Sequence, residues 1–182
     1  MIILIAGASH TGKTVLAQKL LESYHYPYLS MDHLKMGLIR SGNTSLTVFD
    51  DDAMTEFLWP IVREMIKTAI ENGQNLIVEG CYIPFVWEES FDECYRAHIR
   101  AIRLVMSKSY IENHFDDILH HASDAEQRLD DSGCTKQWLI EENEKELARS
   151  IRCPDSCILI EDRYDVLEAA QKLLNPEGMV CV

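Results

Sequence analysis

The chain has 182 residues, of which 30 are Asp or Glu and 17 are Lys or Arg, so its formal net charge is −13, and 47% of its residues are hydrophobic. This length predicts one globular domain over 1–182. The acidity disfavours nucleic acid and anionic membranes as partners, because a protein that neutralises many phosphates needs a basic face.

The first half of the chain alternates apolar runs with helical patterns, which predicts strand–helix units and a parallel sheet. Strands are expected at 2–6, 26–30 and 75–79, and helices at 13–24, from Asp32 to about 41–42, and at 52–72. The long helix is the clearest, since apolar residues recur there with the 3.6-residue period. We expect Asp32 to cap the shorter helix, and the acids at 50–52 and Gly73 to delimit the longer one.

The second half of the chain predicts strands at 101–105 and 157–160 and helices at 135–152 and 165–174. The polar segment 107–131 predicts a helix followed by an irregular insertion. The apolar start at 2–6 is too short to span a bilayer and follows no basic segment, so we expect a cytoplasmic protein without a membrane segment. The six scattered cysteines are therefore expected to be reduced thiols.

The strongest chemical signal is Gly-Ala-Ser-His-Thr-Gly-Lys-Thr at 7–14, which matches G-x-x-x-x-G-K-[ST] in full between a predicted strand and a predicted helix. Backbone N–H groups of such a loop surround a phosphate, and the helix N-terminus adds the positive end of its dipole. Lys13 is expected to reach the β- and γ-phosphates of ATP, and the Thr14 hydroxyl to ligate Mg²⁺. The residues expected to bind ATP are Gly7, Ser9, His10, Thr11, Gly12, Lys13, Thr14 and Val15.

A P-loop occurs in switches, motors and kinases, and the rest of the sequence favours a kinase. The guanine-reading N-K-x-D of GTP-binding switches is absent, and the one D-x-x-G, at 130–133, lies in a polar segment rather than after a strand. The chain is also too short for the signature segments of large motor and transporter ATPases. A small kinase is the class that fits these features best.

With this loop, and with Ser30-Met31-Asp32-His33-Leu34-Lys35 after the second predicted strand, the sequence resembles the nucleoside-monophosphate-kinase-like group of P-loop phosphotransferases. This group includes adenylate kinase, shikimate kinase, 2-phosphoglycerate kinase and chloramphenicol phosphotransferase. The resemblance implies an α/β fold of three layers, with a five-stranded parallel sheet flanked by helices and a small helical lid at about 107–134. It also implies transfer of the γ-phosphoryl group of ATP to a small metabolite, either an alcohol or a phosphate acceptor.

The resemblance points to residues that hold the acceptor. Asp32 would orient or deprotonate an acceptor hydroxyl, or it is only a helix cap. Lys35 and Arg40 would contact an anionic group of the acceptor, or they are solvated helix residues. Glu79, at the end of the third strand, would approach Mg²⁺ or touch the acceptor, or it only begins a loop.

The polar segment before the helix at 135–152 resembles a kinase lid. Arg128-Leu129-Asp130-Asp131 is similar to the Arg-x-Asp-Asp of adenylate kinase lids, in which the arginine clamps the transferring phosphoryl group, so Arg128 is a candidate catalytic residue. Lys145, Arg149 and Arg152 recur at near-helical spacing and can share one face, where they would bind phosphate or form surface ion pairs.

The sequence departs from adenylate kinase at two points. Arg128 is not followed by a second lid arginine, and His114 stands where relatives carry an arginine after the fourth strand. These two departures leave nucleotide specificity and the identity of the acceptor open.

Arg163 and several aromatic residues suggest two further roles. Arg163 or Tyr164, after the fifth strand, would stack on the nucleotide base. The three tryptophans at 59, 87 and 138 are expected to be packing residues.

Two other function classes remain compatible with the sequence. A regulatory P-loop protein would bind ATP with Mg²⁺ and transfer phosphate to no acceptor. A polynucleotide or RNA-end kinase would need a basic groove, which the net charge of −13 disfavours. The sequence does not indicate an oligomeric state.

Overall fold

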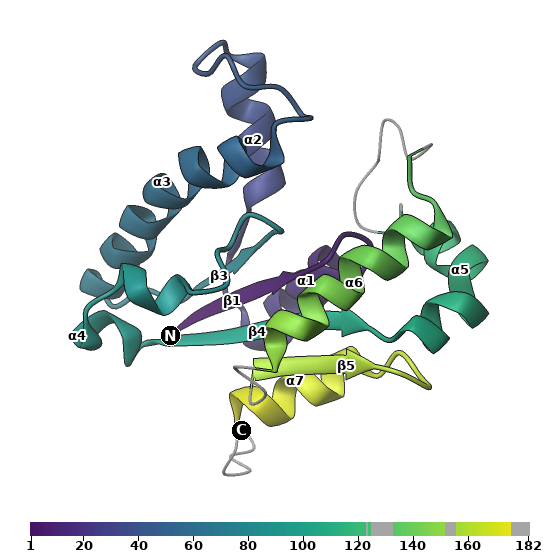
Figure 1. Cartoon of the computed structure of the whole chain (residues 1–182). Helices are drawn as coiled ribbons and strands as arrows, with labels where there is room; N and C mark the ends of the chain where they lie inside the picture. Colours follow the sequence, from purple (N-terminus) through teal and green to yellow (C-terminus); the bar gives the residue numbers. More distant parts are fainter. Residues whose placement is uncertain (123, 125–132, 152–155, 176–182) are drawn as a thin grey trace.

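The computed structural model describes residues 1–122, 124, 133–151 and 156–175. Five strands form one sheet (Figure 1), namely β1 (Ile2–Gly7), β2 (Tyr28–Ser30), β3 (Leu76–Glu79), β4 (Ile99–Met106) and β5 (Cys157–Ile160). The strand order is β2-β3-β1-β4-β5, and every neighbouring pair is parallel. The predicted α/β fold with a five-stranded parallel sheet is confirmed.

The described residues form seven α-helices: α1 (Lys13–Tyr24), α2 (Met31–Arg40), α3 (Asp51–Glu71), α4 (Glu93–Arg96), α5 (Lys108–His121), α6 (Lys136–Ser150) and α7 (Val166–Leu174). The six longer ones match the predicted helices to within a few residues. The short α4 and the 3₁₀ turn at Trp87–Ser90 were not predicted. None of the helices within the described ranges combines the length and the apolar character needed to cross a membrane.

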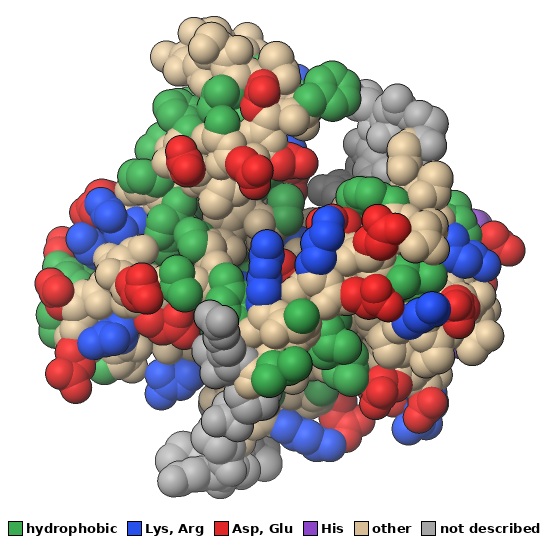
Figure 2. Space-filling view, viewed as in Figure 1, with side chains coloured by type: hydrophobic (Ala, Val, Ile, Leu, Met, Phe, Trp, Pro, Cys, Tyr) green, Lys and Arg blue, Asp and Glu red, His purple; other side chains and the backbone are tan. Residues whose placement is uncertain are grey.

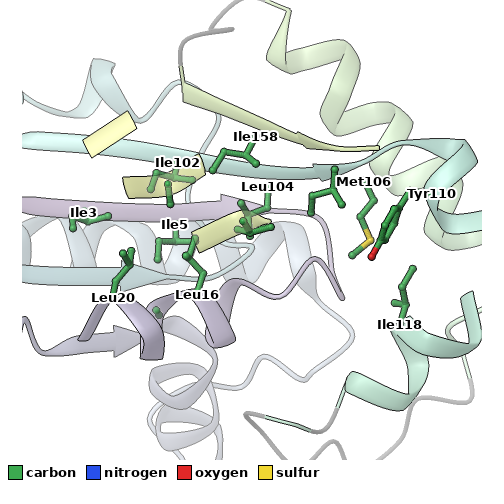
Figure 3. Close-up of a cluster of buried hydrophobic side chains, with 14 of the residues drawn as sticks. Ile3, Ile5, Leu16, Leu20, Ile102, Leu104, Met106, Tyr110, Ile118 and Ile158 are labelled. Carbon is green, nitrogen blue, oxygen red and sulfur yellow. The ribbon is translucent and has the colours of Figure 1, made fainter. Parts of the chain in front are cut away.

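The central strand β1 is apolar throughout because it packs on both faces. Ile3 and Ile5 pack with side chains from α1, β4 and β5 (Figure 3). Ile2 and Leu4 point to the opposite face and pack with side chains from α3. Successive side chains of a strand alternate between faces, so a strand covered on both sides reads as a continuous apolar run. Helices therefore form the two outer layers of a three-layer fold.

The start of α2 differs from the prediction. The N-cap of α2 is Ser30, the last residue of β2, and Asp32 lies inside the first helical turn. The prediction that Asp32 caps this helix was therefore wrong. Strand β2 passes into α2 without a loop, so the capping position falls two residues earlier. Asp32 is left with its carboxylate on the first turn of the helix, where the helix dipole favours a negative charge.

Strand β1 ends at Gly7, whose backbone has a φ of 135°. A Cβ atom built at this position would meet the carbonyl oxygen of Leu104 on the neighbouring strand β4. Both the backbone conformation and the close approach of the two strands require glycine here. The first glycine of the P-loop thus has a packing role in addition to opening the phosphate-binding turn.

We expect Gly7→Ala to lower the free energy of unfolding by about 3 kcal/mol, because the new methyl group strains φ and collides with the backbone of β4. Urea denaturation measures the change. Gly37→Ala is the matched control: Gly37 lies inside α2 with open space around it, so alanine there is expected to stabilise the protein by about 0.5–1 kcal/mol. Equal stabilities of the Gly7 variant and the wild type would contradict this account.

Candidate active site

A wide cleft of about 1990 Å³ lies at the carboxyl ends of the parallel strands. The P-loop at 7–15 forms one wall, and α2, the start of α3, the loop after β3 and α6 contribute the others. Figure 2 shows this face hollowed between α6 and the α2–α3 side of the molecule. Ligands of open parallel sheets bind at this edge, because loops and helix N-termini converge there.

The P-loop is shaped by its own internal hydrogen bonds. Lys13 is nearly buried, and its Nζ donates to the carbonyl oxygen of Ala8 at 2.7 Å. The Thr11 hydroxyl donates to the same oxygen at 2.8 Å. Gly12 adopts a φ of 81° at the N-cap of α1, which turns the loop into the helix. The ammonium group of Lys13 is thus held across the loop at the N-terminus of α1.

Seven of the eight residues expected to bind ATP line the cleft: Gly7, Ser9, His10, Gly12, Lys13, Thr14 and Val15. The side chain of Thr11 does not face the cleft, because it is fully buried beneath the loop. Its hydroxyl braces the loop through Ala8 instead. Thr11 would therefore contact a phosphate through its backbone N–H and not through its side chain.

Tyr164 supports the P-loop from the far end of the chain. Its hydroxyl donates to the carbonyl oxygen of Thr11 at 3.0 Å, and a Cβ atom at Gly12 would collide with that hydroxyl. Burial raises the pKa of Tyr164 to about 12, so the hydroxyl keeps its proton and remains a donor at neutral pH. Tyr164 also lines the cleft. The other candidate for base stacking, Arg163, is exposed and pairs with Asp165 at 3.3 Å.

Thr14 and Glu79 lie together at the base of the cleft. Glu79 ends β3 and is 1% exposed, and its Oε2 accepts a hydrogen bond from the Thr14 hydroxyl at 3.4 Å. Hydroxyl and carboxylate oxygens are the ligands that Mg²⁺ prefers, usually together with substrate phosphates. Among the described residues, no group of three or more His, Cys, Asp or Glu is arranged to hold a metal ion. The two residues therefore fit a magnesium ion that is held largely by the phosphates of a nucleotide.

Asp32 lies on the cleft in a chain of polar contacts that joins α2 to α3. Lys35 bonds to Asp32 Oδ1 at 2.7 Å and donates to the Tyr82 hydroxyl at 2.8 Å. The Tyr82 hydroxyl donates in turn to Asp51 Oδ1 at 3.0 Å. Burial raises the pKa of Tyr82, so this hydroxyl stays protonated. Sequence reasoning identified Asp32 and Lys35 but missed Tyr82 and Asp51.

Arg103 is a second functional candidate that sequence reasoning missed. It lies within β4, almost buried, and its guanidinium bonds to Glu146 Oε2 of α6 at 2.6 Å. The guanidinium also lies 4.8 Å from the ring centroid of Phe85. The sequence did contain a signal for this residue, namely an arginine between the apolar residues Ile102 and Leu104 of a predicted strand. A cation buried in this way needs a specific partner.

The other predicted basic residues are more exposed. Arg40 is exposed at the end of α2 and lines the cleft. Arg149 lines it from α6 and donates to Glu146 Oε1 at 3.3 Å, and Lys145 pairs with Glu142 at 2.7 Å. The candidates Arg128 and Arg152 lie outside the described residues.

One aromatic position near the cleft, Trp138, differs from expectation, and His114 lies outside the cleft. Trp138, predicted to be a packing residue, is 38% exposed, lines the cleft, and contacts His10 edge-on with ring centroids 6.4 Å apart. His114 is not among the cleft residues, because its ring stacks on Tyr110 at 4.5 Å, where the backbone of α5 departs from helical geometry. Trp59 and Trp87 are buried, as predicted. The four cysteines in the described segments are free thiols.

No protein-family model and no curated protein matches the sequence. Solved structures do match its fold. Shikimate kinase from Bacteroides thetaiotaomicron is 16% identical, with 98% of this chain and 99% of that chain covered and a TM-score of 0.59. A gluconokinase from Sinorhizobium meliloti is 14% identical, with 94% and 88% covered and a TM-score of 0.52. Shikimate kinase from Aquifex aeolicus is 15% identical, with 98% and 97% covered and a TM-score of 0.51.

These similarities span nearly the whole chain at low sequence identity, so they establish the arrangement of the elements rather than a shared substrate. They agree with the P-loop between β1 and α1 and with the five parallel strands. The chain has the α/β fold of the shikimate kinases and the gluconokinase that it matches.

Proposed function

We propose that this chain is a Mg²⁺-dependent kinase that transfers the γ-phosphoryl group of ATP to a hydroxyl group of a small metabolite. One observation carries the proposal: the P-loop with Lys13 and the carboxylate of Asp32 line the same cleft. A phosphate-binding loop alone binds nucleotide, whereas a carboxylate in the same cleft can orient or deprotonate an acceptor hydroxyl. Kinases among the structural neighbours support the class.

In this mechanism the P-loop backbone and Lys13 bind the β- and γ-phosphates and stabilise the charge that spreads over the transferring group. Thr14 and Glu79 would hold Mg²⁺, which when bound neutralises phosphate charge. Asp32 orients the acceptor hydroxyl toward the γ-phosphorus and accepts its proton. Lys35 and Tyr82 hold the Asp32 carboxylate in place through the contacts described above.

The proposal also covers the lid. We assign this role to the segment at about 107–134, which follows β4, and to the α6 side of the cleft. Arg128, Arg149 and Arg152 are the candidates for contact with the transferring phosphoryl group. Closure over the cleft would exclude water and so favour phosphoryl transfer over hydrolysis of ATP. We place this single kinase domain, 1–182, in the cytoplasm.

A screen with γ-labelled ATP and Mg²⁺ tests the function. The acceptors are nucleoside monophosphates, phosphoglycerate, shikimate, gluconate, polyols, aminoglycosides and short oligonucleotides. We expect one class of small metabolite to yield a labelled phosphate ester with the wild type and none with Lys13→Ala. Tight binding of Mg²⁺–ATP without transfer to any acceptor would instead identify a regulatory nucleotide-binding protein. Labelling of oligonucleotide ends would identify a polynucleotide kinase.

A further inference from the structure

The charges on the walls of the cleft limit which acceptor it can hold. Nine carboxylates and seven basic side chains of the described residues line the cleft. Two of the basic side chains, Lys13 and Lys19, belong to the P-loop and α1, on the nucleotide side. Among the described residues, the basic side chains left for the acceptor are Lys35, Arg40, Arg103, Lys145 and Arg149.

Four of these five cations are already paired with carboxylates of the same cleft. Lys35 pairs with Asp32 at 2.7 Å, and Lys145 with Glu142 at 2.7 Å. Arg103 and Arg149 share one carboxylate, that of Glu146, at 2.6 and 3.3 Å. Three carboxylates thus offset all but one of these four positive charges.

One of these pairs, Arg103–Glu146, is well shielded from water, since its side chains are 11% and 15% exposed. In the Lys35–Asp32 pair the lysine is 13% exposed and the aspartate 34%. An anionic acceptor that drew Arg103 away would leave the poorly solvated Glu146 carboxylate beside a second negative charge, and one that drew Lys35 away would leave Asp32 without its ion pair. Breaking a buried pair in this way is strongly unfavourable. These cations are thus better suited to hold Glu146 and Asp32 in place than to bind an acceptor anion.

Arg40 is the one basic side chain of this set without an ion pair among the described residues, and it is exposed at the end of α2. Three acids of the first turns of α3 line the same cleft: Asp51, Asp52 and Glu56. Figure 2 shows acidic side chains gathered over this end of the molecule. These three acids, with Asp32, Glu142 and Glu146, place six carboxylates against the five basic side chains, so the formal charge of the described residues on the acceptor wall is negative.

We propose that the phosphate acceptor is a hydroxyl compound without a carboxylate or phosphate group, such as a polyol, an amino alcohol or an amino sugar. This inference rests on the proposed kinase function. The carboxylates in the first turns of α3 would accept hydrogen bonds from hydroxyl groups and would attract an ammonium group. The same carboxylates repel anions. Shikimate and gluconate, which name the neighbouring kinases, are both carboxylates, so the acceptor class would differ from theirs.

Acceptors that share a carbon skeleton and differ in charge provide the first test. We would measure kcat/KM with labelled ATP for glucitol against gluconate, glycerol against glycerate, methyl shikimate against shikimate, and glucosamine against glucuronate. The uncharged or cationic member of the productive pair is expected to exceed the anion by at least about 10-fold, which corresponds to 1.4 kcal/mol. A preference for the anionic member would overturn the acceptor class while leaving the kinase function intact.

Cys81 provides a second test that requires no known acceptor. Cys81 is an exposed residue that lines the cleft, although burial of its thiol raises the pKa to about 11. Without nucleotide, we would measure its rates of reaction with a cationic and an anionic methanethiosulfonate by peptide mapping. The ratio of the two rates cancels the effect of the pKa, and Cys94, which is exposed outside the cleft, is the internal control.

We expect the rate with the cationic reagent, divided by the rate with the anionic reagent, to be several-fold higher at Cys81 than at Cys94. The positive charge of Lys13 acts on Cys81 and favours the anionic reagent. The decisive measurement of this rate ratio is therefore the one made in Lys13→Ala. Asp52→Asn with Glu56→Gln should reduce the ratio, and Glu168→Gln on α7 should not. An unchanged or anion-favouring ratio would overturn the proposed charge of the cleft. A cation-favouring ratio in a protein that phosphorylates nothing would instead refute the kinase function alone.

Discussion

Replacing Lys13 with alanine is expected to lower the rate of phosphoryl transfer by about 10²–10³-fold, the usual effect of removing one preorganised group that stabilises transition-state charge. The ammonium group lies on the cleft at the N-terminus of α1, where the other donors of the loop are backbone amides that the substitution leaves in place. The loss should therefore appear mainly in kcat. Initial rates with labelled ATP and the acceptor found by screening measure it.

The fold should survive this substitution. Lys13 contributes one hydrogen bond, to Ala8, so the variant is expected to lose only about 1 kcal/mol of stability. Circular dichroism and urea denaturation check this. Lys172→Ala is the matched control, because Lys172 is an exposed lysine on α7 that pairs with Glu168 away from the cleft. Full activity in the Lys13 variant would remove the P-loop from the mechanism and with it the proposed function.

Asp32→Asn is expected to reduce kcat by about 10²–10⁴-fold, the range for loss of a general base, with little change in the affinity for ATP. The amide cannot accept the proton of an acceptor hydroxyl, and it also loses the ion pair with Lys35. Single-turnover rates and the binding of an ATP analogue separate the two effects. A large loss of ATP affinity with unchanged kcat would show that Asp32 serves the nucleotide side of the cleft.

His33→Ala is the control for Asp32→Asn. His33 lies next to Asp32 on α2, is exposed, and is absent from the residues that line the cleft. We expect this variant to keep the wild-type rate. A wild-type rate in Asp32→Asn itself would leave Asp32 with only its favourable place in the first turn of α2.

The sheet and the P-loop could be predicted from sequence because their signals are local. Strand β1 reads as a continuous apolar run, α3 shows the helical period over 21 residues, and the loop between β1 and α1 is a contiguous motif. Each signal depends on neighbours within a few positions. The wrong N-cap at Asp32 is also instructive: the sequence resembled a cap, but the direct passage from β2 into α2 moved that position to Ser30.

The acceptor wall could not be predicted in the same way, because its contacts join distant parts of the chain. Lys35 and Tyr82 are 47 positions apart, and Arg103 and Glu146 are 43 apart. The sequence identified Lys35 and Arg149 as cations that could bind an anion, and their pairing with Asp32 and Glu146 depends on how α2 and α6 pack. Pairing of this kind changes the charge that a ligand meets, and a single sequence does not contain it.

The hydrogen bond from Tyr164 to Thr11 spans 153 positions of the chain. During synthesis, the ribosome completes the P-loop motif well before the tyrosine that braces it, which emerges only after β5. A nascent chain shorter than this would carry the motif with an unsupported loop. Nucleotide affinity should therefore develop late in translation, so that a partly made chain does not compete for ATP.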